Sequence, residues 1–149
     1  MIVTTIQQQQ LAAHIRLITD FFMARKGRHC LPSITVDRAF RYLAFCKLTG
    51  RLNVRFENGR PESLIIAWPD WFERIEAKHA EGRPQFDWCP VRPGDSIFVA
   101  EVVGTRRGVR SLYQSLIEAY PHLLRLPVYT YRRGALVRLG QKTIERFMS

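Results

Sequence analysis

The sequence predicts an α/β (α+β) fold, a mixed central sheet with helices on both faces. Two helical patterns precede a strand hairpin, and a later helical pattern separates a long apolar strand from two further strands. Helical and strand periodicities are therefore interleaved along the chain, which favours helices packed on a sheet. The 149 residues, 46% of them hydrophobic, suit a single domain over 1–149.

Two helices are expected before the first strand. The first opens near the glutamine run 7–10, carries apolar residues at helical spacing and closes at Gly27. The second starts after Thr35, a residue type that caps helices well, has Asp37 in its first turn and ends at Gly50.

A β-hairpin is expected next. Residues 52–56 alternate between apolar and polar types, and residues 64–68 are almost continuously apolar. Asn58-Gly59 between them favours a tight turn, and a longer turn that reaches Pro61 is the alternative.

The remaining elements are an insert and a second pair of strands. A short helix over 71–79 and a proline-rich loop form a helix-loop insert around 69–93. Residues 128–131 and 135–139 have the composition of strands, and a short closing helix is expected from Gln141.

The most informative segment runs from Gly94 to Val109. Four apolar residues precede Glu101 and two follow it, and a run without alternation predicts a strand covered on both faces. Burying a carboxylate is costly without a partner or a role, so Glu101 is either catalytic or paired with an arginine. From Val109 to Pro121 apolar residues recur at helical spacing, so the strand leads into an amphipathic helix.

The formal net charge of +10 comes from 19 arginines and four lysines against 13 acidic residues. Arginine binds phosphate and carboxylate groups in a bidentate manner, so we expect an acidic or phosphate-bearing partner. Nucleic acid, a phosphate-bearing cofactor and an acidic carrier protein all fit, because the arginines are scattered and accompany no nucleic-acid motif.

The spacing of the cysteines bears on metal binding, and the length of the apolar runs bears on the cellular location of the protein. Cys30, Cys46 and Cys89 have neither zinc-site spacing nor a dense disulfide pattern, so we expect reduced thiols and no metal. No apolar run reaches membrane-spanning length, and residues 1–10 do not resemble a signal peptide. We therefore expect a cytoplasmic protein without a membrane span.

The order of elements, with an amphipathic helix after a carboxylate-bearing strand, resembles the Gcn5-related N-acetyltransferase (GNAT) superfamily. In that superfamily a glycine-containing turn binds the cofactor pyrophosphate through backbone amides. The resemblance implies donor contacts from Val103, Gly104, Arg106, Arg107, Gly108, Val109 and Arg110. The motif begins here with Thr105, and Arg110 replaces a small residue, so a guanidinium either crowds the phosphate or binds it.

A narrower similarity is to the toxin-activating lysine acyltransferases, which share this general fold and take fatty acyl groups from acyl carrier protein. In that family a Gly-Asp pair precedes an aromatic strand that bears a catalytic aspartate. Gly94-Asp95, Phe98 and Glu101 stand in those places, although the Pro-Phe-Gly turn of the family is absent. The family's catalytic histidine lies upstream of the hairpin and corresponds roughly to His29.

These features predict an acyltransferase that uses acyl-CoA or an acyl carrier protein thioester as co-substrate and an amine or hydroxyl as acceptor. Glu101 is the candidate base, expected beside the helix start at Gly108, and His29 is expected to share proton transfer with it. Tyr131 is a candidate proton donor on a later strand. The alternatives are a loop histidine without a role and a tyrosine that only packs on the sheet.

A second interpretation is a non-catalytic basic module that binds nucleic acid or an acidic protein. Residues 129–133 interleave tyrosine with arginine, which is compatible with base stacking and phosphate contact. A buried Glu101 favours the enzyme, since a nucleic-acid binder has no need of a carboxylate there. A relative of the fold without activity is the third interpretation, because Arg110 departs from the donor motif.

Overall fold

The computed structural model describes residues 5–26, 34–80, 94–119, 121, 125–132, 135–140 and 142. Its elements are α1 (Thr5–Lys26), α2 (Val36–Leu48), β1 (Leu52–Glu57), β2 (Arg60–Asp70), α3 (Phe72–Ala80), β3 (Ser96–Gly104), α4 (Arg106–Ala119), β4 (Val128–Arg132) and β5 (Ala135–Leu139). This is the predicted order of elements. His29, the loop of the insert over 81–93 and most of the closing helix expected from Gln141 lie outside the described residues.

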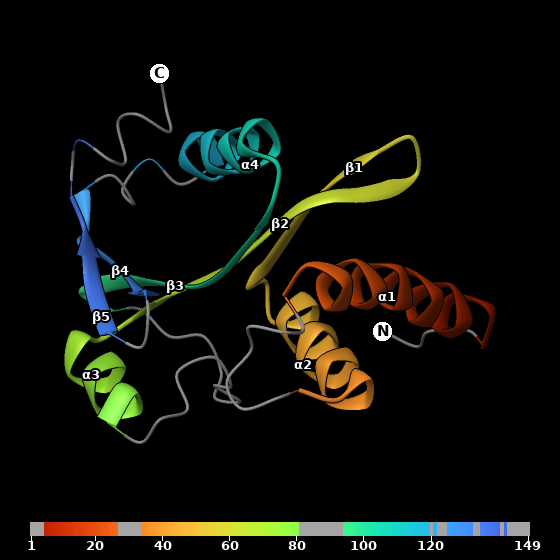
Figure 1. Ribbon diagram of the computed structural model, residues 1–149, viewed down its shortest axis with the longest axis horizontal. Helices are drawn as coiled ribbons and strands as arrows, with labels where there is room; N and C mark the ends of the chain where they lie inside the picture. Colours follow the sequence, from red (N-terminus) through yellow and green to blue (C-terminus); the bar gives the residue numbers. More distant parts are fainter. Residues whose placement is uncertain are drawn as a thin grey trace.

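The described strands form one five-stranded sheet in the order β1-β2-β3-β4-β5 (Figure 1). Neighbouring strands are antiparallel except β3 and β4, which are parallel. A parallel pair needs a crossover, and α4 supplies it between these two strands (Figure 1). The mixed sheet and the four helices of the described chain confirm the predicted α/β (α+β) class.

Buried apolar residues form two clusters, one on each face of the sheet. The larger includes Ile18 and Phe22 of α1 and Leu43 of α2, and the smaller includes Val109 and Leu112 of α4. Full burial of such a side chain contributes roughly 1.5–3 kcal/mol. Helices on both faces therefore explain why β2 and β3 carry apolar runs without alternation.

Local signals in the sequence predicted the N-cap of α2 and the hairpin turn correctly. The Arg38 amide donates to Thr35 Oγ1 at 3.2 Å, so Thr35 caps α2 as predicted. Asn58 and Gly59 have φ angles of 54° and 75°, and Glu57 pairs with Arg60. This is the tight two-residue turn, so the alternative that extends to Pro61 is wrong.

The Gly94-Asp95 pair joins β3 to α3. Asp95 Oδ1 accepts a hydrogen bond from the Phe72 amide at 2.9 Å and thereby satisfies a free amide of the first turn of α3. A Cβ on Gly94 would lie 2.2 Å from the Asp70 carbonyl carbon and oxygen, so only glycine fits here. Strand β2 extends to Asp70 and α3 follows from Phe72, so the first two positions of the insert expected around 69–93 belong to the strand.

Two expectations about the chain as a whole concern its thiols and its helices. Cys46 is a buried free cysteine, as predicted, whereas Cys30 and Cys89 lie outside the described residues. None of the described helices combines the length and the apolar character needed to cross a membrane.

Candidate functional site

Strands β3 and β4 pair only briefly before they separate. The pairing joins Ile97, Phe98 and Val99 to the three residues 128–130, and β3 then continues to Gly104 along β2 alone. At the last paired position Thr130 Oγ1 donates to the Val99 carbonyl oxygen at 2.9 Å. Beyond Val99, the β4 side of β3 therefore has no strand paired with it in the described part of the chain.

A β-bulge on β3 sets the direction of the Glu101 side chain. Ile66 pairs with Glu101, but its neighbour Ala67 pairs with Val99, which leaves Ala100 as the extra residue. Residues directly opposite each other in an antiparallel pair point to the same face. Ile66 belongs to the cluster formed with α1 and α2, so Glu101 points to that face.

The expected position of Glu101 beside Gly108 is therefore wrong. Gly108 lies in the first turn of α4, which covers the other face, where Val99 and Val102 pack. Alternation along the strand then turns Glu101 away from α4. When a strand is apolar on both faces, its sequence does not indicate toward which face a single polar side chain points. The direction of Glu101 is therefore set by packing alone.

Tyr42 on α2 lies close enough to Glu101 to be influenced by its charge. The phenol of Tyr42 is buried, and burial is the main cause that raises its pKa. Cys46 and the Glu101 carboxylate raise the pKa further, whereas the Arg51 guanidinium lowers it. A carboxylate and a guanidinium therefore both act on this one phenol.

Arg51 is buried between aromatic rings, with 1% of its surface exposed. The guanidinium carbon lies 4.9 Å from the centre of the Phe45 ring and 4.8 Å from that of Trp68. The Arg51 carbonyl accepts a hydrogen bond from the Ala67 amide at 3.0 Å, which fixes the backbone beside β2. A buried polar cluster thus lies between α2 and the sheet, and we call it the Glu101 cluster. It consists of Glu101, Tyr42 and Arg51.

The sequence interpretation missed two of these three residues. Tyr42 follows Ala39 by three positions and precedes Cys46 by four, so the helical stripe was the signal that would have placed it inward. Arg51 gives no such signal, because it stands between a glycine turn and a strand where arginines are normally exposed.

Tyr131 lies on the same face of the sheet but beside α3. Its ring meets Phe98 edge to face with centroids 5.2 Å apart, and its hydroxyl donates to the Ile75 carbonyl oxygen at 3.3 Å. Burial raises the pKa of Tyr131, so the phenol keeps its proton at neutral pH. The position of His29 is outside the described residues, and its pairing with Glu101 stays a prediction.

At the start of α4, side chains of the protein itself form the hydrogen bonds that a donor phosphate was expected to form. Gly108 N donates to Thr105 Oγ1 at 3.1 Å, and Thr105 Oγ1 donates to Glu62 Oε1. Glu62 Oε2 lies 3.3 Å from Arg55 Nε. The Gly108 amide that was expected to bind donor phosphate is therefore taken by the cap, and a carboxylate already lies at this helix end.

Glu62 is well suited to remain charged in this place. Its hydrogen bond from Thr105 is the main cause that lowers its pKa, and the positive charges of Arg55 and Arg107 lower it further. Gly108 packs directly on β2, since a Cβ there would lie 2.4 Å from Ser63 Oγ. This close approach brings the β1–β2 hairpin and the first turn of α4 to one end of the molecule.

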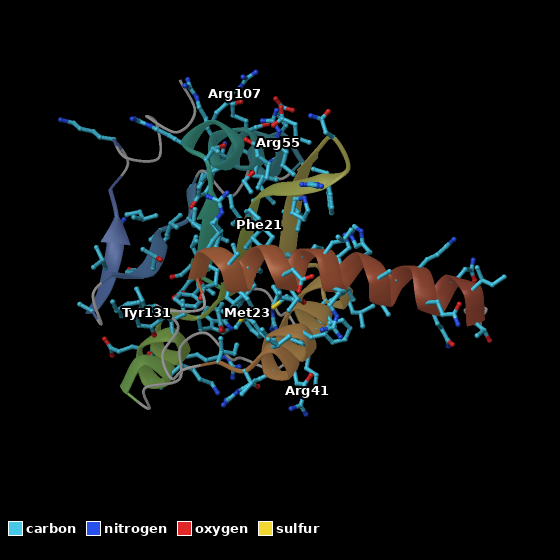
Figure 2. All side chains as sticks on the ribbon, turned by 45° about the vertical axis from the view of Figure 1, so that its right-hand side comes forward. Phe21, Met23, Arg41, Arg55, Arg107 and Tyr131 are labelled. Carbon is cyan, nitrogen blue, oxygen red and sulfur yellow. The ribbon has the colours of Figure 1, made fainter. Side chains whose placement is uncertain are left out.

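That end of the molecule is rich in arginine. Figure 2 shows Arg55 and Arg107 together at the top of the view. The hairpin contributes Arg55 and Arg60, and the first turns of α4 contribute the exposed Arg106, Arg107 and Arg110. We call these five residues the arginine end. Its positive charge adds to that of the helix dipole and suits an anionic partner.

Neither a metal centre among the described residues nor a related protein accompanies these sites. In the described ranges, no three His, Cys, Asp or Glu side chains gather in a way that could hold a metal ion. No protein-family model, curated protein or solved structure matches the chain.

Proposed function

We propose that this protein is an acyltransferase in which Glu101 is the general base and a thioester arm lies along the unpaired stretch of β3. The observation that carries the proposal is the position of Glu101. It lies two residues beyond Val99, where the pairing with β4 ends, and it is buried with 6% of its surface exposed. A buried carboxylate at the point where two parallel strands separate suits acid–base chemistry on a ligand held there.

In the proposed reaction Glu101 removes a proton from the amine or hydroxyl of the acceptor. The acceptor atom attacks the thioester carbonyl, and the negative oxygen that forms is stabilised by backbone N–H groups of β3 beyond Val99. The carbon–sulfur bond then breaks, and the thiolate leaves and takes up a proton. Tyr131, which keeps its proton at neutral pH, and His29 are the candidate donors for that last step.

The donor's phosphates bind to side chains in this proposal and not to the helix amides. Glu62 and Thr105 occupy the start of α4, which leaves the guanidinium groups of Arg106, Arg107 and Arg110 for phosphate or for an acidic carrier. The donor is an acyl-CoA or an acyl carrier protein, because both carry phosphate next to the thioester arm.

A basic module that binds nucleic acid or an acidic protein is the second candidate. The observation in its favour is the arginine end, which needs no catalytic residue to bind a polyanion. Purified protein that absorbs at 260 nm and loses this absorbance after a high-salt wash would favour this second function.

The test is mass spectrometry of acyl transfer from acyl-CoA and acyl carrier protein donors to a panel of amines and hydroxyl compounds. Glu101→Gln protein with the circular dichroism spectrum of the parent should transfer at a rate lower by about a hundredfold or more, as expected for a lost general base. Glu118→Gln, an exposed glutamate of α4, is the matched control and should transfer at the parent rate. Equal rates for Glu101→Gln and the parent protein would refute the role of Glu101.

A further inference from the structure

Few charged side chains are buried in the described part of the protein. Among the described residues, the buried charged side chains are Arg51, Asp70 and Glu101. Asp70 is satisfied by groups that follow it in the chain, since its Oδ2 lies 3.1 Å from Arg74 Nε of α3 and its Oδ1 accepts from the Trp71 amide at 2.8 Å. The other two, the Arg51 guanidinium and the Glu101 carboxylate, belong to the Glu101 cluster.

These two side chains approach the same face of the sheet at neighbouring positions. Leu52 pairs with Ile66, and Ile66 pairs with Glu101, so the three lie in one row across β1, β2 and β3. Arg51 directly precedes Leu52, and its guanidinium lies over Trp68, which is two residues from Ile66 on β2 and in the same cluster.

We propose that Arg51 is the positioning residue of Glu101, whose guanidinium supplies the positive charge that keeps the buried carboxylate ionised and held in one orientation. A carboxylate alone in an apolar cluster takes up a proton, because burial disfavours its charged form. The rings of Phe45 and Trp68 restrict the guanidinium and hence the carboxylate beside it. The catalytic part of this inference rests on the proposed function, since a general base must be ionised before it can accept a proton.

In the part of the chain that the structure describes, the other groups packed around Glu101 are neutral in their ordinary state. Tyr42 and Cys46 approach from α2, and the raised pKa of Tyr42 keeps its phenol protonated. On this face of the sheet, the buried residues of α1 and β2 without charge are Ile15, Ile18, Thr19, Phe22, Leu64, Ile66 and Trp68. Asp70 at the end of β2 is charged, and it pairs with Arg74. Arg51 is the one buried cation in the described part of the chain, so the counter-charge for Glu101 falls to it.

The direct test measures the pKa of Glu101 by carbon-13 NMR in glutamate-labelled protein, with Glu101→Gln used to assign its signal. Arg51→Met removes the charge and should raise the pKa of Glu101 by about 1–3 units, whereas Arg51→Lys should raise it less. Arg55→Met removes a guanidinium that pairs with Glu62 and is the matched control, expected to leave the Glu101 signal unchanged. An unchanged Glu101 pKa in Arg51→Met overturns the proposal.

A second measurement keeps the test valid if Arg51→Met unfolds, because that variant leaves a carboxylate buried without its counter-charge. The double variant Arg51→Met with Glu101→Gln removes both charges and should have a higher urea midpoint than Arg51→Met alone. A double variant that is less stable than Arg51→Met overturns the pairing.

Transfer assays separate this inference from the proposed function. If the protein transfers acyl groups, Arg51→Lys should move the acid limb of its pH–rate profile to higher pH, in step with the Glu101 pKa. If Arg51→Met raises the pKa of Glu101 but the parent protein transfers no acyl group, the proposed function is refuted and the pairing is kept. If the protein transfers acyl groups, and Arg51 substitutions change neither the acid limb of the pH–rate profile nor the pKa of Glu101, the pairing is refuted and the proposed function is kept.

Discussion

At the residue scale, Glu62 shows how one carboxylate changes the character of a helix end. It accepts a hydrogen bond from Thr105, lies 3.3 Å from Arg55 Nε and faces the first turn of α4. A negative charge beside the amino end of a helix is favourable, because the free N–H groups carry partial positive charge. The protein thus supplies its own anion at the point where the GNAT resemblance placed an external phosphate.

Glu62→Gln should make stability less dependent on pH in the acid range. The pKa of Glu62 is lower in the folded protein than its ordinary value of 4.5, so its stabilising contribution is present above that pH. The contribution is lost as the pH falls through the lower, folded pKa. Urea midpoints of the parent protein and the variant should therefore differ at pH 7 and converge towards pH 2. A constant difference across this range would contradict the assignment, and Glu118→Gln is the control.

At the element scale, β2 is the strand on which the neighbouring elements converge. It pairs with both β1 and β3, and glycines let the connection from β3 to α4 approach it closely. Gly104 has a φ angle of +120°, and a Cβ on it would lie 2.4 Å from the Glu62 carbonyl oxygen and 2.5 Å from Ser63 Cα. The chain can therefore turn from β3 into α4 at this place only with glycine.

Gly104→Ala should lower the free energy of unfolding by about 1–3 kcal/mol, the usual effect of forcing atoms into a packed region. The obstructing atoms belong to the backbone of β2 and cannot rotate away, and the positive φ adds strain. Gly140→Ala is the matched control, because nothing lies within 4 Å of a Cβ there. Urea unfolding of both variants checks this, and equal midpoints for the two would contradict the close approach of β3 and β2.

At the scale of the whole molecule, positive charge that is scattered along the sequence is concentrated at one place in the fold. The arginines are scattered along the chain, but the fold brings the β1–β2 hairpin and the start of α4 together to form the arginine end (Figure 2). Exposed charges attract a charged ligand over distances set by salt, about 10 Å at 0.1 M ionic strength. Binding at this end should therefore depend steeply on ionic strength.

Replacing Arg106, Arg107 and Arg110 together with alanine should weaken the binding of an acyl-CoA and flatten its salt dependence. Titration calorimetry at a series of salt concentrations measures both effects. If the variant binds acyl-CoA at low salt with the affinity of the parent protein, the arginine end is not part of the donor site.

A matched control removes the same charge from elsewhere on the surface. Arg25, Arg38 and Arg41 lie exposed on α1 and α2, and Arg41 lies at the opposite end of the molecule from Arg107 (Figure 2). Their triple alanine variant has the same net charge as the first. It should bind acyl-CoA more tightly than the variant of the arginine end.

The order of elements and their local signals could be predicted from the sequence. Thr35 caps α2 through its own side chain, and Asn58-Gly59 adopts the left-handed turn that these residue types allow. Both depend on contacts within about four residues, so the sequence alone determines them. The burial of Glu101 was predicted in the same way, from the apolar residues directly around it.

Only the tertiary structure decided which way Glu101 faces and what surrounds it. Its direction depends on a bulge at Ala100 and on pairing with Ile66, and Arg51 reaches the cluster through the connection from α2 to β1. The Glu62–Thr105 hydrogen bond likewise joins residues 43 positions apart. Strand register and the face on which helices pack are set by the summed burial of many side chains, and no short sequence window contains that sum.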